Sequence, residues 1–193
     1  NHDSLNLKSS VALIVDRQTH EVLFEKNAHA ALPIASITKL MTSLVVMDAQ
    51  LPLGENIIIH QDDVNTYPGR AKSRVTEHAQ MTREQALLLA LMSSENRAAH
   101  ALGRNYPGGV PAFVEAMNAK AKILGMSQSK FADPTGLSSE NISSPEDLTR
   151  LVEAAYQHKV IREFSTRPDY SIMIGKREQK FVNTNRLVRA SDM

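Results

Sequence analysis

The sequence predicts an α+β fold in which a mostly helical middle section lies between short strands. Apolar runs at residues 11–15 and 21–24 flank a polar segment, as the two strands of a β-hairpin do. Residues 82–93, 95–104, 110–124 and 145–159 show the apolar patterns and end signals of helices. Residues 170–174 and 179–182 have the pattern of two further strands.

The first predicted helix covers residues 36–48, with the sequence SITKLMTSLVVMD. It is apolar on most sides, and Ser36, Lys39 and Ser43 repeat along one stripe at i, i+3 and i+7. We therefore expect a buried helix with one polar seam. A short strand at residues 57–60 is expected to follow it.

The later helices carry recognisable start and stop signals. Thr82 and Gln85 form a capping box ahead of the apolar run at residues 86–92. The sequence YPGG stops the helix at 95–104, and Gly125 stops the one at 110–124. Ser144 caps the helix at 145–159, with Pro145 at its first position. Residues 50–150 or so should form a mostly helical lobe within a single domain spanning residues 1–193.

Composition excludes several classes of partner and site. The chain of 193 residues has 22 basic and 21 acidic residues, a net charge of +1 and no run of Lys or Arg. This balance favours neither nucleic acid nor an anionic membrane surface. There is no cysteine, so disulfides and thiolate metal sites are excluded. No stretch reaches the roughly 18 apolar residues that span a bilayer, so no transmembrane segment is predicted.

Lys39 is the residue that most needs an explanation, because an isolated ammonium in an apolar helix carries a large desolvation cost. Ser36 lies one turn earlier on the same stripe, so a partly desolvated amine could take the serine proton and create a nucleophile. Ser36 also lies near the helix start, where free N–H groups favour an oxyanion. The simpler alternative is a helix cap at Ser36 with Lys39 extending to water.

Two short motifs each occur twice. A second S-x-x-K, Ser127 to Lys130, follows Gly125 in what reads as an extended segment, where positions three apart face opposite sides. The tetrapeptide SSEN occurs at residues 93–96 and again at 138–141. The first copy, with Ser94 and Asn96, is predicted to form a rigid corner between two buried helices, with Ser93 or Ser94 as a cap. The second, with Ser139 and Asn141, is predicted to be a solvated turn.

Taken together, these segments resemble a known family. PIASITKLMT, LLLALMSSENRAAHAL, FVEAMNAKAKILGM, FADPTGLSSENISSPEDLTRLV and NTNRLV are similar to the low-molecular-mass penicillin-binding proteins of the serine peptidase S11, β-lactamase-like group. The similarity is strongest to the D-alanyl-D-alanine endopeptidases called penicillin-binding protein 7/8. It implies a β-lactamase/transpeptidase-like fold, in which an antiparallel sheet packs against helices beside a helical subdomain.

The resemblance also implies a site. The family uses the motifs S-x-x-K, S-x-N and K-T-G, and the first two are present as Ser36 to Lys39 and Ser94 to Asn96. By resemblance Ser36 is the nucleophile, Lys39 the general base and Ser94 a proton relay, while Asn96 binds the peptide group of the substrate. Peptidoglycan stem peptides are the implied substrates and β-lactams the covalent inhibitors. No metal or organic cofactor is implied, and the family is periplasmic.

The sequence departs from the family pattern in one respect. It contains no K-T-G and ends at Met193, shortly after NTNRLV, where the K-T-G strand of the family would begin. We therefore expect the domain to be C-terminally incomplete in this chain, without the later strands and one oxyanion-hole amide. On that expectation residues 1–193 alone would not make a competent enzyme.

Two alternatives remain open at this stage. A β-lactamase shares the S-x-x-K serine, but the segment after Pro134 has no E-x-x-x-N to activate water, which disfavours that enzyme. A non-catalytic penicillin sensor or peptidoglycan-binding module could retain the pocket and lose turnover. Peptide hydrolysis would identify a peptidase, whereas stoichiometric binding of β-lactam without hydrolysis would identify a penicillin sensor or binding module.

Overall fold

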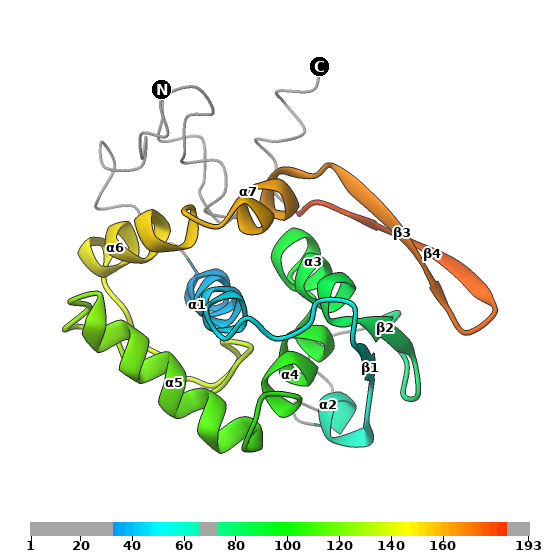
Figure 1. Ribbon diagram of the computed structural model, residues 1–193, viewed down its shortest axis with the longest axis horizontal. Coiled ribbons are helices and arrows are strands. Elements are labelled where there is room, and N and C mark those ends of the chain that lie inside the picture. Colours follow the sequence, from blue (N-terminus) through cyan, green and yellow to red (C-terminus); the bar gives the residue numbers. More distant parts are fainter. Residues whose placement is uncertain (1–32, 66–72, 185–193) are drawn as a thin grey trace.

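The computed structural model describes residues 33–65 and 73–184 of the chain, and the predicted hairpin at 11–15 and 21–24 lies outside them. Helices predominate, and α1 runs through the middle of the others (Figure 1). The helices are α1 (Ile34–Asp48), α2 (Gln61–Asn65), α3 (Arg83–Ser93), α4 (Asn96–Arg104), α5 (Gly109–Ile123), α6 (Pro145–Ala155) and α7 (Lys159–Thr166). The strands are β1 (Asn56–Ile58), β2 (Gln80–Thr82), β3 (Asp169–Ile174) and β4 (Arg177–Val182).

Helix α1 is buried over most of its length, as its apolar sequence predicted. Every residue from Ile37 to Val46 is buried, and the helix packs against α3, α4, α5 and α6. A helix that is apolar on nearly all sides is stable only in such a position. Two of the three residues of the polar seam, Lys39 and Ser43, are buried too. Their charged and hydroxyl groups must therefore find partners inside the protein.

Helix α3 begins as the capping box predicted. The Thr82 hydroxyl accepts a hydrogen bond from the Gln85 N–H at 3.1 Å, and the Gln85 side chain accepts one from the Thr82 N–H at 3.0 Å. Both contacts satisfy amides that the first turn of a helix leaves free. The apolar run from Ala86 to Met92 is then buried.

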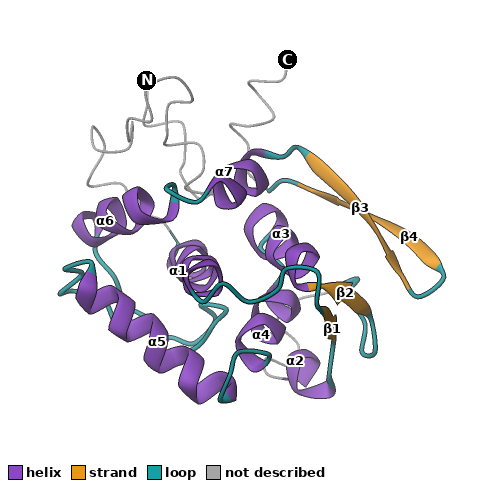
Figure 2. Ribbon diagram, in the orientation of Figure 1, coloured by secondary structure: helices purple, strands orange, loops and turns teal. Residues whose placement is uncertain are grey.

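The described strands form two separate antiparallel pairs (Figure 2). In the first, Ile57 of β1 lies opposite Met81 of β2. In the second, the β3–β4 hairpin extends outward past α3 and α7, with Tyr170 opposite Phe181. Strand β2 and the short helix α2 were not predicted, because segments of three and five residues carry too little periodicity.

The helix predicted at residues 145–159 is wrong at its C-terminal end. Helix α6 stops at Ala155, a turn follows, and α7 starts at Lys159. Arg162 of α7 donates to the Tyr156 carbonyl, so the end of α6 gains a hydrogen bond that a continuous helix would have made internally. The turn redirects the chain so that Ile161 and Phe164 are buried in the core.

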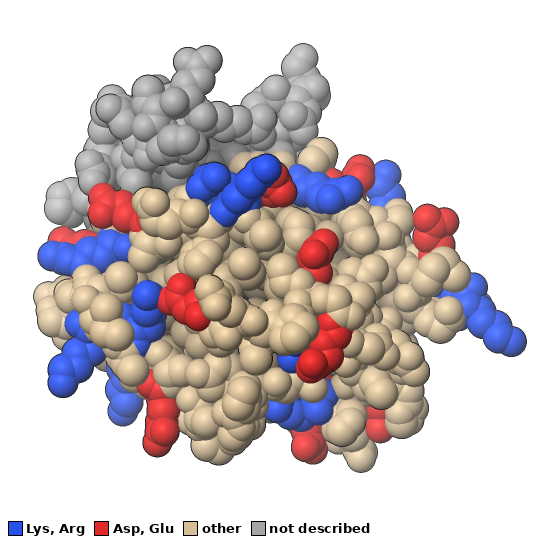
Figure 3. All heavy atoms as spheres, in the orientation of Figure 1, with Lys and Arg blue, Asp and Glu red and all other residues tan. Residues whose placement is uncertain are grey.

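Basic and acidic side chains are interspersed on the face shown in Figure 3. This distribution agrees with the net charge of +1 and shows no field of one sign on that face. In residues 33–65 and 73–184, no helix is both long enough and apolar enough to cross a membrane.

Candidate active site

Ser36 lies in the first turn of α1, the position that the sequence predicted for it. Pro33 occupies the cap position with a φ of −57°, and no side chain caps the helix there. The Ser36 N–H donates to the Pro33 carbonyl at 3.0 Å. Ser36 is half-buried, so its hydroxyl lies where the core meets the surface, next to the positive end of the helix dipole.

Lys39 does not extend to water, which removes the simpler explanation of this motif. Its side chain is only 3% exposed, and its Nζ donates to the Thr135 carbonyl at 3.0 Å. Burial lowers the pKa of Lys39 to about 8, although the negative charges of Asp133 and Glu95 partly oppose the shift. About a tenth of the amine is therefore neutral at pH 7 and can accept a proton.

The first SSEN copy forms the predicted corner between α3 and α4. Ser94 ends α3 in the left-handed region, with φ 53° and ψ 39°, a conformation that costs a residue other than glycine about 1 kcal/mol or more. The predicted cap is confirmed at Ser94, which is the C-cap of α3 and donates from its N–H to the Leu89 carbonyl. The Ser93 hydroxyl donates to the Leu89 carbonyl at 3.0 Å, whereas the Glu95 side chain caps α4 by accepting from the Arg97 N–H at 3.1 Å.

Asn96 is the first residue of α4 and has an unusual side chain. Its Oδ1 is buried and has no hydrogen-bond partner among the described residues. A buried acceptor in that state is costly unless another group supplies a donor. The N–H of a peptide substrate is a donor of the required kind.

The loop that contains the Lys39 partner was not predicted as part of the site. It runs from Asp133 to Gly136 and packs directly on α1, where the Thr42 hydroxyl donates to the Pro134 carbonyl at 2.7 Å. Gly136 has a φ of +87°, and a Cβ added there would come within 2.5 Å of the Ala35 Cα. The sequence DPTG does signal a turn, but it gives no sign that the turn lies against α1.

The serines of the second motif copies, Ser127 and Ser139, lie on the surface and do not form such an arrangement. Ser127 and Lys130 are both exposed, in a turn and in an isolated bridge to Ile142. Ser139 is exposed in a turn, as predicted. Asn141, however, is not solvated. It is 4% exposed, and its Nδ2 donates to the Ser138 carbonyl at 2.9 Å.

The end of the described chain returns to the same corner. The Thr184 N–H and hydroxyl both donate to the carbonyl of Met92, at 3.0 and 3.4 Å. Asn183 is buried and donates to the carbonyls of Ser165 and Arg167. The segment NT of NTNRLV is thereby held beside the last turn of α3, two residues before Ser94.

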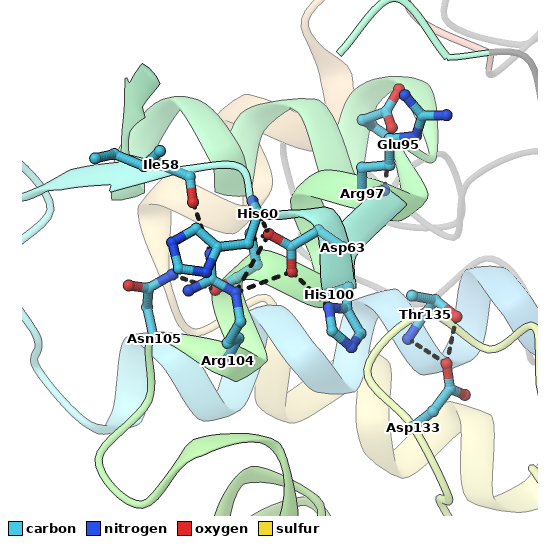
Figure 4. A network of polar contacts seen from close by, with 11 residues as sticks. Ile58, His60, Asp63, Glu95, Arg97, His100, Arg104, Asn105, Asp133 and Thr135 are labelled. Carbon is cyan, nitrogen blue, oxygen red and sulfur yellow. Dashed lines mark hydrogen bonds and ion pairs between the residues drawn. The ribbon is translucent and has the colours of Figure 1, made fainter. Parts of the chain in front are cut away.

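A second polar cluster, also missed from the sequence, lies between α2 and α4 (Figure 4). The buried carboxylate of Asp63 lies 2.6 Å from the His100 Nδ1 and 2.9 Å from an Arg104 nitrogen. It also accepts from the His60 N–H at 2.8 Å. An open pocket of about 500 Å³ adjoins the cluster. The pocket is lined by Asp62, Asn65, His100, Arg104, Val110 and Pro111.

The Asp63 cluster ties α2 to α4 and β1, since Arg104 also donates to the Ile58 carbonyl at 2.6 Å. Burial alone would raise the pKa of Asp63, but hydrogen bonds from His100, Arg104 and His60 outweigh burial and lower it. Across residues 33–65 and 73–184, no group of three His, Cys, Asp or Glu side chains could hold a metal ion.

Solved structures place this fold in a class. A D-alanyl-D-alanine carboxypeptidase from Mycobacterium tuberculosis is 28% identical, with a TM-score of 0.70 over 81% of this chain and 59% of that one. The Streptomyces K15 DD-transpeptidase is 25% identical, with a TM-score of 0.73 over 81% and 66%. The chain therefore has the fold of the penicillin-binding proteins and DD-peptidases, which confirms the predicted α+β, β-lactamase/transpeptidase-like class.

Sequence relatives make the assignment more specific. The family model for peptidase S11, described as D-alanyl-D-alanine carboxypeptidase, matches residues 1–193, and the chain belongs to this family. D-alanyl-D-alanine endopeptidases from Pseudomonas aeruginosa and Escherichia coli are 47% and 44% identical over 94% of the chain. The chain spans 59% of the length of each of these two relatives.

Proposed function

We propose that the protein is a serine-type D-alanyl-D-alanine endopeptidase or carboxypeptidase that cleaves peptidoglycan through an acyl-enzyme. The observation that carries the proposal is the Lys39 amine, buried one helical turn after Ser36 and with a pKa lowered to about 8. A buried lysine with a lowered pKa is suited to act as a general base. Membership of the peptidase S11 family supports the same reaction.

In the proposed reaction the Ser36 Oγ attacks the carbonyl carbon of a D-Ala residue while the neutral Lys39 amine takes the hydroxyl proton. The tetrahedral oxyanion forms near the N-terminal end of α1, whose free N–H groups favour negative charge. When the intermediate collapses, the peptide C–N bond breaks, and Ser94 gives its hydroxyl proton to the leaving amine and receives in return the proton that Lys39 took from Ser36. Water then cleaves the Ser36 ester and restores the free enzyme.

Asn96 has the role of binding the substrate in this proposal. Its buried Oδ1 lacks a partner in residues 33–65 and 73–184, so an incoming peptide N–H would satisfy it at the first residue of α4. The proposed substrates are peptidoglycan stem peptides and the proposed covalent inhibitors are β-lactams. The proposed location is the periplasm, where peptidoglycan lies, and the reaction requires neither a metal nor an organic cofactor.

Digestion of purified muropeptides tests the proposal. Cross-linked dimers and monomeric pentapeptides are incubated separately with the protein and with its Ser36→Ala variant, and products are separated by chromatography and identified by mass. Loss of dimer identifies an endopeptidase, and loss of terminal D-Ala a carboxypeptidase. Stoichiometric β-lactam binding without peptide hydrolysis would instead identify a penicillin sensor, and rapid β-lactam turnover a β-lactamase.

A further inference from the structure

The loop that holds Lys39 is organised around one carboxylate. Asp133 is 7% exposed, and its Oδ2 accepts from the Thr135 N–H at 3.0 Å and from the Thr135 hydroxyl. Its Oδ1 accepts from the Gly136 N–H at 3.1 Å. The carboxylate therefore fixes two consecutive backbone amides of the loop.

The hold on Gly136 determines the direction of the Thr135 carbonyl. The Thr135 C=O and the Gly136 N–H belong to the same planar trans peptide unit, in which they point in opposite directions. Because Asp133 accepts from the N–H on one side, the carbonyl faces the other side. There it accepts the hydrogen bond from the Lys39 Nζ.

Asn141 braces the same loop, and every polar group of its side chain is used. Its Nδ2 donates to the Asp133 Oδ1 at 2.5 Å and to the Ser138 carbonyl at 2.9 Å. Its Oδ1 accepts from the N–H groups of Ala132 and Asp133, at 2.8 and 3.4 Å. The asparagine of the second SSEN copy thus lies behind the carboxylate and restricts its rotation.

The loop is also fitted closely to α1. Gly136 lies against the Ala35 backbone with no room for a Cβ, and the Pro134 carbonyl accepts from Thr42. These contacts lie on either side of Lys39 along the helix. The Thr135 carbonyl consequently has a fixed position relative to the helix that carries both the serine and the lysine.

A general base works only when its lone pair is held toward the proton it removes. A lysine amine on four rotatable bonds needs such an anchor. We propose that Asp133 and Asn141 are positioning residues, which hold the Thr135 carbonyl and through it orient the Lys39 amine to take the proton of Ser36. This inference rests on the function proposed above. The negative charge of Asp133 also raises the pKa of Lys39 against the effect of burial.

The test compares acylation by a fluorescent penicillin across pH 6 to 10 in the protein and in Asp133→Asn. Asparagine keeps the size of the side chain but removes the charge and can no longer accept from every present donor. We expect acylation at pH 8 to fall about 10- to 100-fold, as for a lost hydrogen bond to a charged group. The pH at which acylation rises should move downward, since the charge that raises the pKa of Lys39 is gone.

Asp147→Asn is a matched control. Asp147 is a buried carboxylate that also organises a turn, because it accepts from the Gln128 N–H and the Ser129 hydroxyl, both at 2.8 Å. Its hydrogen bonds are to Gln128, Ser129 and Ser144, in a turn that does not include Thr135 or Gly136. We expect this variant to lose stability in urea as Asp133→Asn does, while its acylation stays within about twofold of the unaltered protein and its pH profile stays in place.

A second readout does not depend on catalysis. The Lys39 signal in protein with ¹³Cε-labelled lysine is titrated by NMR, and it should titrate at lower pH in Asp133→Asn. Unchanged titration together with acylation within about twofold of the original would overturn the inference. If Asp133→Asn does not fold, Asn141→Ala is tested in the same acylation assay. We expect slower labelling of this variant, and an unchanged labelling rate would contradict the inference. Absence of any label on Ser36 in the unaltered protein would instead refute the proposed function, and the titration would still report on Asp133.

Discussion

The pH dependence of acylation follows directly from the burial of Lys39. With a pKa of about 8, roughly a tenth of the amine is neutral at pH 7, compared with fewer than about one molecule in a thousand for an ordinary lysine. Acylation by a β-lactam should therefore rise about tenfold for each pH unit below 7.5 or so and level off above about pH 9. A rate constant that is flat from pH 6 to 9, or that still rises beyond pH 10, would refute this role for Lys39.

Substitution of Lys39 tests the same reasoning from the side of stability. The pKa of Lys39 lies below that of a lysine in the unfolded chain, so the unfolded state binds more protons between about pH 8 and 10.5. This group therefore makes the protein less stable below pH 8, and its effect disappears as the pH rises above that window. Replacing Lys39 by methionine, of similar volume and uncharged, should gain about 1 to 3 kcal/mol at pH 7.

The gain in stability should be accompanied by a loss of function. Lys39→Met and Lys39→Ala should each slow acylation by at least ~10²-fold, the contribution of a general base. Urea unfolding at pH 7 and pH 10, measured with penicillin labelling on the same samples, checks both effects. A Lys39→Met protein that is less stable than the original and still labels rapidly would show that the lysine is a structural residue.

Four further substitutions should give distinct results. Gly136→Ala should lower the free energy of unfolding in urea by about 2 to 4 kcal/mol, because of the positive φ and the contact with Ala35, and should slow labelling. A free energy of unfolding within about 0.5 kcal/mol of that of the unaltered protein would contradict the close fit of the loop to α1. Asp63→Asn should cost about 3 kcal/mol at pH 7, because the partly buried Arg104 guanidinium loses its carboxylate partner. The pKa of Asp63 is lowered in the folded state, so its contribution to stability is present above about pH 4 and is lost as the pH falls further. The loss of stability caused by Asp63→Asn should therefore become smaller in acid. A loss of stability that does not change with pH would exclude the carboxylate as its source. Ser94→Ala should slow acylation about 10²-fold with stability changed by less than about 1 kcal/mol, whereas Ser139→Ala should leave the rate nearly unchanged; the reverse result would mean that the two SSEN copies were misassigned.

Local signals in the sequence were sufficient for the elements that carry the serine, the lysine and the corner. Helix α1 was predictable because its apolar residues surround a single polar stripe. Helix α3 was predictable because Thr82 and Gln85 form a capping box at its N-terminus. The corner at Ser94 was predictable because α3 and α4 follow each other with only two residues between them. Each of these features depends on residues close together in the chain.

The partner of Lys39 could not be predicted in the same way. Its nitrogen binds a backbone carbonyl 96 positions away in the chain, and every residue has such a carbonyl, so the choice of Thr135 leaves no mark on residue type. Asn141 was misjudged for a related reason. The residues on either side of it, Glu140 and Ile142, are exposed, whereas its buried partner Asp133 lies eight positions earlier in the chain.

The most direct test of the account is to identify the residue that a β-lactam acylates. A preparation of the protein that includes a complete domain is incubated with a penicillin at pH 8, digested with trypsin and analysed by mass spectrometry, alongside Ser36→Ala. We predict that the mass of one penicillin is added to the single peptide that contains Ser36 and that the variant carries none. Label on the peptide that contains Ser127, or equal labelling of the variant, would contradict the assignment of Ser36 as the nucleophile.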